Sequence, residues 1–170
     1  IAGSIALIVL LYFIFAVFFP EKIYNTAITL QQKSAGLIEK EFNIGNEKIV
    51  YLESGTGPDV LILLHGFAVD KNTWNAIAKH LSKYRLIIPD LPGFGKSTRE
   101  NNLSYDLFSQ SERLDRFLAG LELKKFFIAG NSMGGNIAGI YSIKYPDKVK
   151  GCILLNNSGV VTPEKSEMIK

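Results

Sequence analysis

Hydrophobic residues are distributed along this 170-residue chain in three different ways. Residues 1–19 contain no charged residue and no Asn, Gln or His, whereas residues 20–40 mix apolar and polar positions loosely. From residue 41 onward, short apolar runs alternate with longer segments of mixed polarity. We therefore expect three parts: a transmembrane anchor (1–19), a juxtamembrane linker (20–40) and a folded domain (41–170).

The first nineteen residues are long enough to cross a bilayer. As an α-helix they would span about 28 Å, close to the roughly 30 Å of a hydrocarbon core. A secretory signal would have a shorter apolar region followed by small residues, but this run ends in Phe18-Phe19-Pro20. The pattern predicts an uncleaved single-pass helix, with a buried core helix as the alternative. Acidic and basic residues nearly balance after it, so the side of the membrane stays open.

The remaining pattern indicates alternating strands and helices. The unbroken apolar run of residues 60–64 is typical of a strand buried on both faces of a parallel sheet. A hairpin is expected around the Gly45-Asn46-Glu47 turn. This alternation predicts an α/β fold with a mostly parallel sheet and flanking helices. Further strands are predicted at residues 86–88, 126–129 and 151–155, and helices at about 27–38, 73–81, 105–121 and 133–145.

Composition and charge narrow the possible partners. The hydrophobic fraction is 47% and the net charge is +3, with acidic and basic residues interleaved and no long basic run. A nucleic-acid partner would normally require a clustered basic face, so none is expected. The single cysteine, Cys152, lies in an apolar run and is predicted to be a small buried residue. It supports neither a disulfide framework nor a metal site.

The segment Gly130-Asn131-Ser132-Met133-Gly134-Gly135 follows a predicted strand and precedes a predicted helix. A G-x-S-x-G sequence in that setting is typical of a nucleophile elbow, a strained turn that exposes a serine hydroxyl. Ser132 is therefore the candidate nucleophile, and a tight turn with an inert serine is the alternative. Gly130, Asn131 and Gly134 are expected to support the turn, because small residues leave room for the helix and the substrate.

An attack by serine on a carbonyl requires hydrogen-bond donors for the developing oxyanion. The amide of Met133, directly after the nucleophile, is one candidate, and the amide of Phe67 in the loop after residues 60–64 is the other. Gly66 would permit the turn of that loop. We expect His65 to hold the loop by hydrogen bonding, with a role as general base as the alternative. His80 is expected to be a solvated surface residue.

Three motifs in this order and spacing resemble the α/β-hydrolase family. They are the His65-Gly66-Phe67 segment with Lys71 and Trp74 after it, the segment from Asp90 to Ser97, and the turn at Ser132. Within the family, the chain resembles membrane-anchored monoacylglycerol lipases and bacterial lipases and esterases over about residues 42–161. The resemblance implies that residues 90–97 form a structural loop, in which Asp90 braces a turn rather than serving as the triad acid.

The family's order of catalytic residues is serine, acid and then histidine. No histidine follows Ser132, and the position after the strand at 151–155 holds Asn156-Asn157-Ser158 without a carboxylate. Asp147 lies before that strand and is expected in a loop. We therefore expect truncation at both ends, with the triad acid, the histidine, a lid and further strands beyond Lys170.

The sequence thus favours a serine hydrolase that cleaves carboxylic esters, such as acylglycerols or other lipid esters, through an acyl-enzyme on Ser132. Its expected partners are a small-molecule or lipid ester substrate and the lipid bilayer, and no metal or organic cofactor is required. The alternatives are carbon–carbon bond hydrolysis, cofactor-free haloperoxidase chemistry, or a non-catalytic membrane protein that retained the fold. The oligomeric state stays open.

Overall fold

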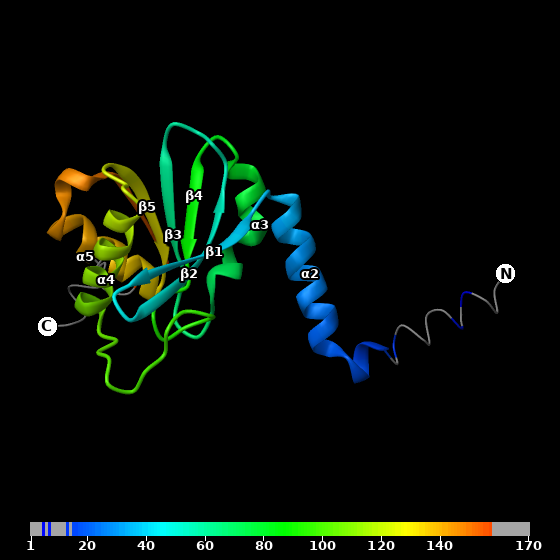
Figure 1. The fold of residues 1–170 in the computed structure, drawn as a ribbon. Coiled ribbons are helices and arrows are strands. Elements are labelled where there is room, and N and C mark those ends of the chain that lie inside the picture. Colours follow the sequence, from blue (N-terminus) through cyan, green and yellow to red (C-terminus); the bar gives the residue numbers. More distant parts are fainter. Residues whose placement is uncertain (1–4, 6, 8–12, 14, 158–170) are drawn as a thin grey trace, which may run out of the picture.

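A computed structural model describes residues 15–157 together with Ile5, Leu7 and Phe13. Its centre is a six-stranded sheet in the order β1-β2-β4-β3-β5-β6. The predicted α/β fold with flanking helices is confirmed (Figure 1). The strands are β1 (Ile38–Ile44), β2 (Glu47–Ser54), β3 (Val60–Leu64), β4 (Arg85–Pro89), β5 (Phe126–Asn131) and β6 (Val149–Leu155).

The sheet is parallel where it carries the candidate site. β3 pairs in parallel with both β4 and β5, and β5 pairs in parallel with β6. β1 and β2 form the predicted hairpin, with Ile44 opposite Glu47 and Gly45 at a φ of 62° in the turn. Because β3 and β5 are parallel neighbours, the loops that follow them leave the sheet at the same edge. The His65 loop and the Ser132 turn therefore start side by side.

The helices cover both faces of this sheet. α4 and α5 lie on one face, and α3 lies on the other (Figure 1). Alternating residues of β3 belong to the two hydrophobic clusters: Ile62 lies in the cluster that contains Phe117 of α4, whereas Leu63 lies in the cluster that contains Trp74. The helices are α2 (Pro20–Ser34), α3 (Asn75–Ala78), α4 (Leu107–Gly120) and α5 (Met133–Lys144), with 3-10 helices η1 (Lys71–Trp74), η2 (Lys79–Leu81) and η3 (Pro146–Lys148).

The predicted helices differ from the observed ones mainly at their ends. α4 begins two residues later than predicted, because the Asp106 side chain accepts hydrogen bonds from the amides of Phe108 and Ser109 and caps it. The single helix predicted over residues 73–81 is a run of η1, α3 and η2. These pieces keep Trp74 and Ala78 buried against the sheet.

The prediction for the linker was wrong in its helix bounds. The helix starts at Pro20, which suits a first turn because its missing N–H needs no partner there. It ends at Ser34, and Gly36 follows at a φ of 63°. β1 then starts at Ile38, where the helix was expected to end. The loose apolar spacing of α2 gave no clear period, which is why its extent was misjudged; none of its residues is buried.

The predicted transmembrane helix, residues 1–19, lies largely outside the described residues. Among the residues that the structure does describe, no helix is long and apolar enough to cross a membrane. The side chains of Phe13, Phe15, Phe18 and Phe19 are exposed.

Cys152 was predicted to be buried but is exposed. The cause is the position of β6, which within the described part of the chain pairs only with β5. Its neighbours Ile153, Leu154 and Leu155 are exposed as well, at 51%, 40% and 39%. The apolar run was therefore correctly predicted as a strand, but its burial does not follow from the described neighbours.

Candidate active site

Ser132 occupies the turn between β5 and α5 in an unusual backbone conformation. Its φ is 53° and its ψ is −116°, a combination that costs energy for a residue with a side chain. Two hydrogen bonds hold it there: the Ser132 amide donates to the Leu155 carbonyl at 2.8 Å, and the Ser132 carbonyl accepts from the Asn136 amide at 3.1 Å. The strain therefore sits on the residue predicted as nucleophile, and the residue itself is exposed.

The glycines beside Ser132 let α5 approach the sheet. A methyl group on Gly130 would collide with the backbone of Gly134, and one on Gly134 would collide with the carbonyl oxygens of Leu64 and His65. The first turn of α5 thus rests directly on the end of β3. This contact explains the requirement for small residues on both sides of the serine.

The loop after β3 faces the same turn. A methyl group on Gly66 would lie 3.5 Å from the Cβ of Ser132, so the two backbones are in close proximity. Ala68, two residues later, has a φ of 60°, which is again a strained value for a residue with a side chain. Strain on both segments that face each other is typical of a functional site rather than of a simple connection.

Two backbone amides at this position are available as donors. Met133 is the first residue of α5, and the first four amides of a helix have no partner within it. None of the loop and turn hydrogen bonds within residues 15–157 uses the Phe67 amide. The partial positive charge of the α5 N-terminus adds to the attraction for an anion. The oxyanion role of Phe67 and Met133 stays a prediction that this geometry supports.

Both ring nitrogens of His65 are already engaged. The ring is fully buried, its Nε2 accepts from the Leu91 amide at 2.9 Å, and its Nδ1 lies 2.7 Å from the Gly66 carbonyl oxygen. Because Nε2 accepts, the proton of the neutral ring is on Nδ1 and is donated to Gly66. Burial lowers the pKa of His65 below its usual value, against the opposing effect of the Gly66 carbonyl. With both ring nitrogens engaged, His65 is poorly placed to act as a general base. The other histidine of the described residues, His80, is exposed in η2, as expected for a surface residue.

A buried ion pair holds the loop from its other end, and sequence reasoning missed it. Lys71 Nζ lies 2.7 Å from Asp90 Oδ2, and both side chains are almost fully buried. Asp90 also accepts from the amides of Lys71 and Lys96, each at 2.8 Å. Asp90 therefore braces the turn as predicted. The signal available in the sequence was a lysine in a motif segment, four residues after the candidate oxyanion donor.

Glu39 of β1 extends this ion pair into a network. Its carboxylate lies 3.2 Å from Lys71 Nζ and 2.7 Å from Lys96 Nζ. Partial burial raises the pKa of Glu39, but the hydrogen bonds and positive charges of Lys96 and Lys71 outweigh it, so its pKa is lowered overall. The segment that follows the Phe67 loop is thus tied to β1 and to the loop after β4.

Two further features complete the surroundings. Asn131 Oδ1 accepts from Asn156 Nδ2 at 3.2 Å, which links the turn to the end of β6. Among the described residues, no group of three or more His, Cys, Asp or Glu could hold a metal ion. The predicted triad acid and histidine lie outside the described residues.

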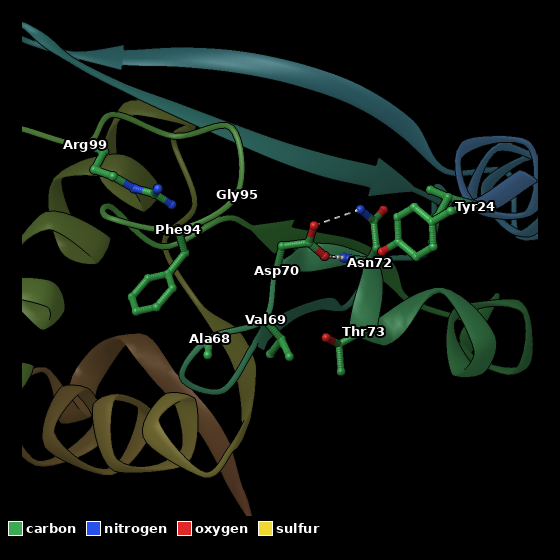
Figure 2. A pocket seen from close by; sticks show the side chains of 10 residues that line it. Tyr24, Ala68, Val69, Asp70, Asn72, Thr73, Phe94, Gly95 and Arg99 are labelled. Atoms are coloured by element: carbon green, nitrogen blue, oxygen red, sulfur yellow. Dashed lines mark hydrogen bonds between the residues drawn. The ribbon is translucent and has the colours of Figure 1, made fainter. Parts of the chain in front are cut away.

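A pocket of about 490 Å³ opens beside the Phe67 loop (Figure 2). One wall consists of Ala68 and Val69, and the opposite walls come from α2 and from the loop that contains Phe94. The Phe94 ring packs edge-on against the rings of His65 and Phe67, at centroid distances of 5.4 and 5.6 Å. The pocket therefore lies beside the Phe67 loop, which supplies Ala68 and Val69 to its wall.

Comparisons with known proteins agree with the geometry. Residues 59–170 match the family described as the alpha/beta hydrolase fold. The chain is 28% identical to monoacylglycerol lipase abhd6-A of Xenopus laevis over 176 residues, which is all of this chain and 52% of the frog protein. It is 40% identical to lipase 1 of Psychrobacter immobilis over 115 residues, which is 66% of this chain and 36% of the lipase.

The crystal structure of a membrane phospholipase A, a bacterial virulence factor, superposes with a TM-score of 0.81 at 34% identity. The superposed region covers 99% of this chain and 58% of the phospholipase chain. This chain thus spans about half the length, or less, of the curated relatives named here. The resemblance inferred from the three motifs is confirmed, and the chain belongs to the alpha/beta hydrolase fold family.

Proposed function

We propose that this protein is a serine hydrolase that cleaves carboxylic esters of lipids, with Ser132 as its nucleophile. The observation that carries the proposal is the strained, exposed Ser132 at the start of α5, facing the glycine of the loop after β3. Relatives named as lipases and monoacylglycerol lipases support the substrate class.

In the proposed reaction, the Ser132 hydroxyl oxygen attacks the ester carbonyl carbon while a base takes its proton. The amides of Phe67 and Met133 donate to the oxyanion of the tetrahedral intermediate, and each such donor is worth roughly a hundred- to a thousandfold in rate. Collapse of the intermediate releases the alcohol, which takes the proton from the base. Water then attacks the acyl-enzyme in the same way and releases the carboxylic acid.

The base and the acid that orients it are proposed to lie beyond Lys170. Both ring nitrogens of His65 are occupied, and His80 belongs to the helical segment that packs on the opposite face of the sheet from α5. The described part of the chain would then supply the nucleophile and the oxyanion donors, and the later part would supply the proton transfer.

We also propose that residues 1–19 anchor the protein in a membrane, with residues 20–40 as the juxtamembrane segment. The uncharged run and the four exposed phenylalanines near its end support this division. The name of the structurally similar membrane phospholipase A is in keeping with it. A site held at a bilayer would meet lipid esters without their leaving the membrane.

The test uses the protein produced from its complete reading frame. A fluorophosphonate probe should label the wild type, and Ser132→Ala should abolish the label and lower ester hydrolysis roughly a millionfold, as loss of a triad nucleophile does. The matched control is Ser82→Ala, an exposed serine directly after η2. A wild-type protein that folds but takes up no label would refute the proposal.

A further inference from the structure

The pocket beside the Phe67 loop carries one side chain of each charge. Arg99 and Asp70 both line it, and within residues 15–157 neither forms an ion pair. Arg99 is exposed, and its Nε donates to the Gly93 carbonyl at 3.0 Å, which anchors the side chain. Within the part of the chain that the structure describes, no hydrogen bond uses its two terminal nitrogens. Figure 2 shows Arg99 and Asp70 on different segments of the pocket wall.

Asp70 is fixed in place by its neighbour. Its two carboxylate oxygens accept from the amide and the side-chain nitrogen of Asn72, at 2.9 and 3.2 Å. Both donors are neutral, so the negative charge of Asp70 is oriented but not cancelled. The pocket thus presents a fixed negative charge and a separate positive charge, and neither has a counter-ion among the described residues.

The remaining wall adds aromatic and apolar surface. Tyr24 and Ile28 lie four residues apart on α2 and therefore share one face of that helix. Across the pocket lies Phe94. Rings of this kind attract a cation placed over their faces. A purely anionic ligand would meet Asp70 and a purely cationic one would meet Arg99, whereas a ligand with both charges would satisfy each.

The place of α2 in the chain adds a second argument. Tyr24 lies five residues after Phe19, which is about 7.5 Å along a helix. The headgroup layer on each side of a bilayer is about 5–8 Å thick. If residues 1–19 cross the membrane, this wall of the pocket lies at headgroup depth.

We propose that this pocket binds the zwitterionic phosphodiester headgroup of a membrane phospholipid, with the phosphate at Arg99 and the ammonium at Asp70, Tyr24 and Phe94. The inference rests on the proposed function and narrows its substrate class. The loop after β3 supplies Ala68 and Val69 to the pocket wall and faces Ser132 at Gly66, so a headgroup held in the pocket would bring the ester bonds of the same lipid towards Ser132.

The experiment compares two substrates in the protein produced from its complete reading frame. One is phosphatidylcholine in vesicles, and the other is p-nitrophenyl butyrate, which has no headgroup. Arg99→Gln should lower the ratio of kcat/KM for the phospholipid to kcat/KM for the butyrate about tenfold, because one charged hydrogen-bond partner is lost. Arg99→Lys should restore part of the ratio, since the charge returns without the planar fork.

The control is Arg116→Gln, an exposed arginine of α4 that does not line the pocket, and it should leave the ratio at the wild-type value. An Arg99→Gln variant with an unchanged ratio would overturn the proposal. So would an equal loss on both substrates, because Arg99 would then act only by holding the Gly93 loop.

A binding measurement separates this proposal from the proposed hydrolase function. Ser132→Ala should bind soluble sn-glycero-3-phosphocholine, detected by calorimetry, and adding Arg99→Gln should weaken that binding about tenfold. If the wild type hydrolyses neither substrate, the proposed hydrolase function fails. The binding measurement would still show whether the pocket binds the headgroup. Absence of Arg99-dependent binding would overturn the headgroup site even in an active enzyme.

Discussion

Replacing Lys71 with methionine should destabilise the protein by about 3 kcal/mol, because it leaves a buried carboxylate without its counter-ion. Lys71 is 1% exposed, Asp90 is fully buried, and their charged atoms are 2.7 Å apart. Removing one partner of such a pair costs about 3–5 kcal/mol. Asp90 would keep its hydrogen bonds from the Lys71 and Lys96 amides, so we expect the lower end of that range.

The assay is urea unfolding of the protein produced from its complete reading frame, followed by circular dichroism. The midpoint should fall for Lys71→Met while the slope is unchanged, and Lys124→Met, at an exposed position, should behave as the wild type. Buried charges are little screened, so the difference should persist in about 1 M salt. A cost below about 1 kcal/mol, or one that salt removes, would show that the pair behaves as a surface ion pair and would refute this reasoning.

Two other changes test the donors and the network. Phe67→Pro removes the proposed oxyanion amide and should lower kcat by roughly a hundred- to a thousandfold, whereas Phe67→Ala keeps the amide and should cost far less; equal effects of the two variants would exclude the amide. Glu39→Gln tests the lowered pKa of the Glu39 carboxyl. Because this pKa is lower in the folded state, the ionised carboxylate contributes its full stabilisation above the unfolded pKa of about 4.5, and this stabilisation is lost as the pH falls through the folded value. The variant should therefore lose less stability than the wild type below that pH in urea titrations, and parallel pH curves would contradict the network.

The sequence predicted those features that depend on local pattern. The apolar run at residues 60–64 and the turn at Ser132 each lie within one short segment, and both were placed correctly. Burial was harder to predict, because it depends on neighbours that are distant in sequence. Cys152 lies in a strand as expected, yet its exposure is decided by what packs on β6.

The ion network shows the same limit for charged residues. Glu39 belongs to β1, Lys71 belongs to η1 and Asp90 directly follows β4, and no spacing rule links such distant positions. A lysine in a polar segment is normally solvated, so nothing in the local sequence indicates that Lys71 is buried. Only the parallel pairing of β3 with β4, which places the two following loops side by side, brings Lys71 to Asp90.

The same topology explains how the backbone amide of Phe67 can be held in place although no hydrogen bond within the described residues uses it. At its start, His65 is fixed by the amide of Leu91. At its end, Asn72 accepts from Gln32 of α2 and Lys71 pairs with Asp90. The intervening residues 66–69 are thus a short span between two anchored ends, and a short span with fixed ends has few conformations. The Phe67 amide therefore needs no internal hydrogen bond to keep its position, and such a bond would occupy the group that we propose as an oxyanion donor.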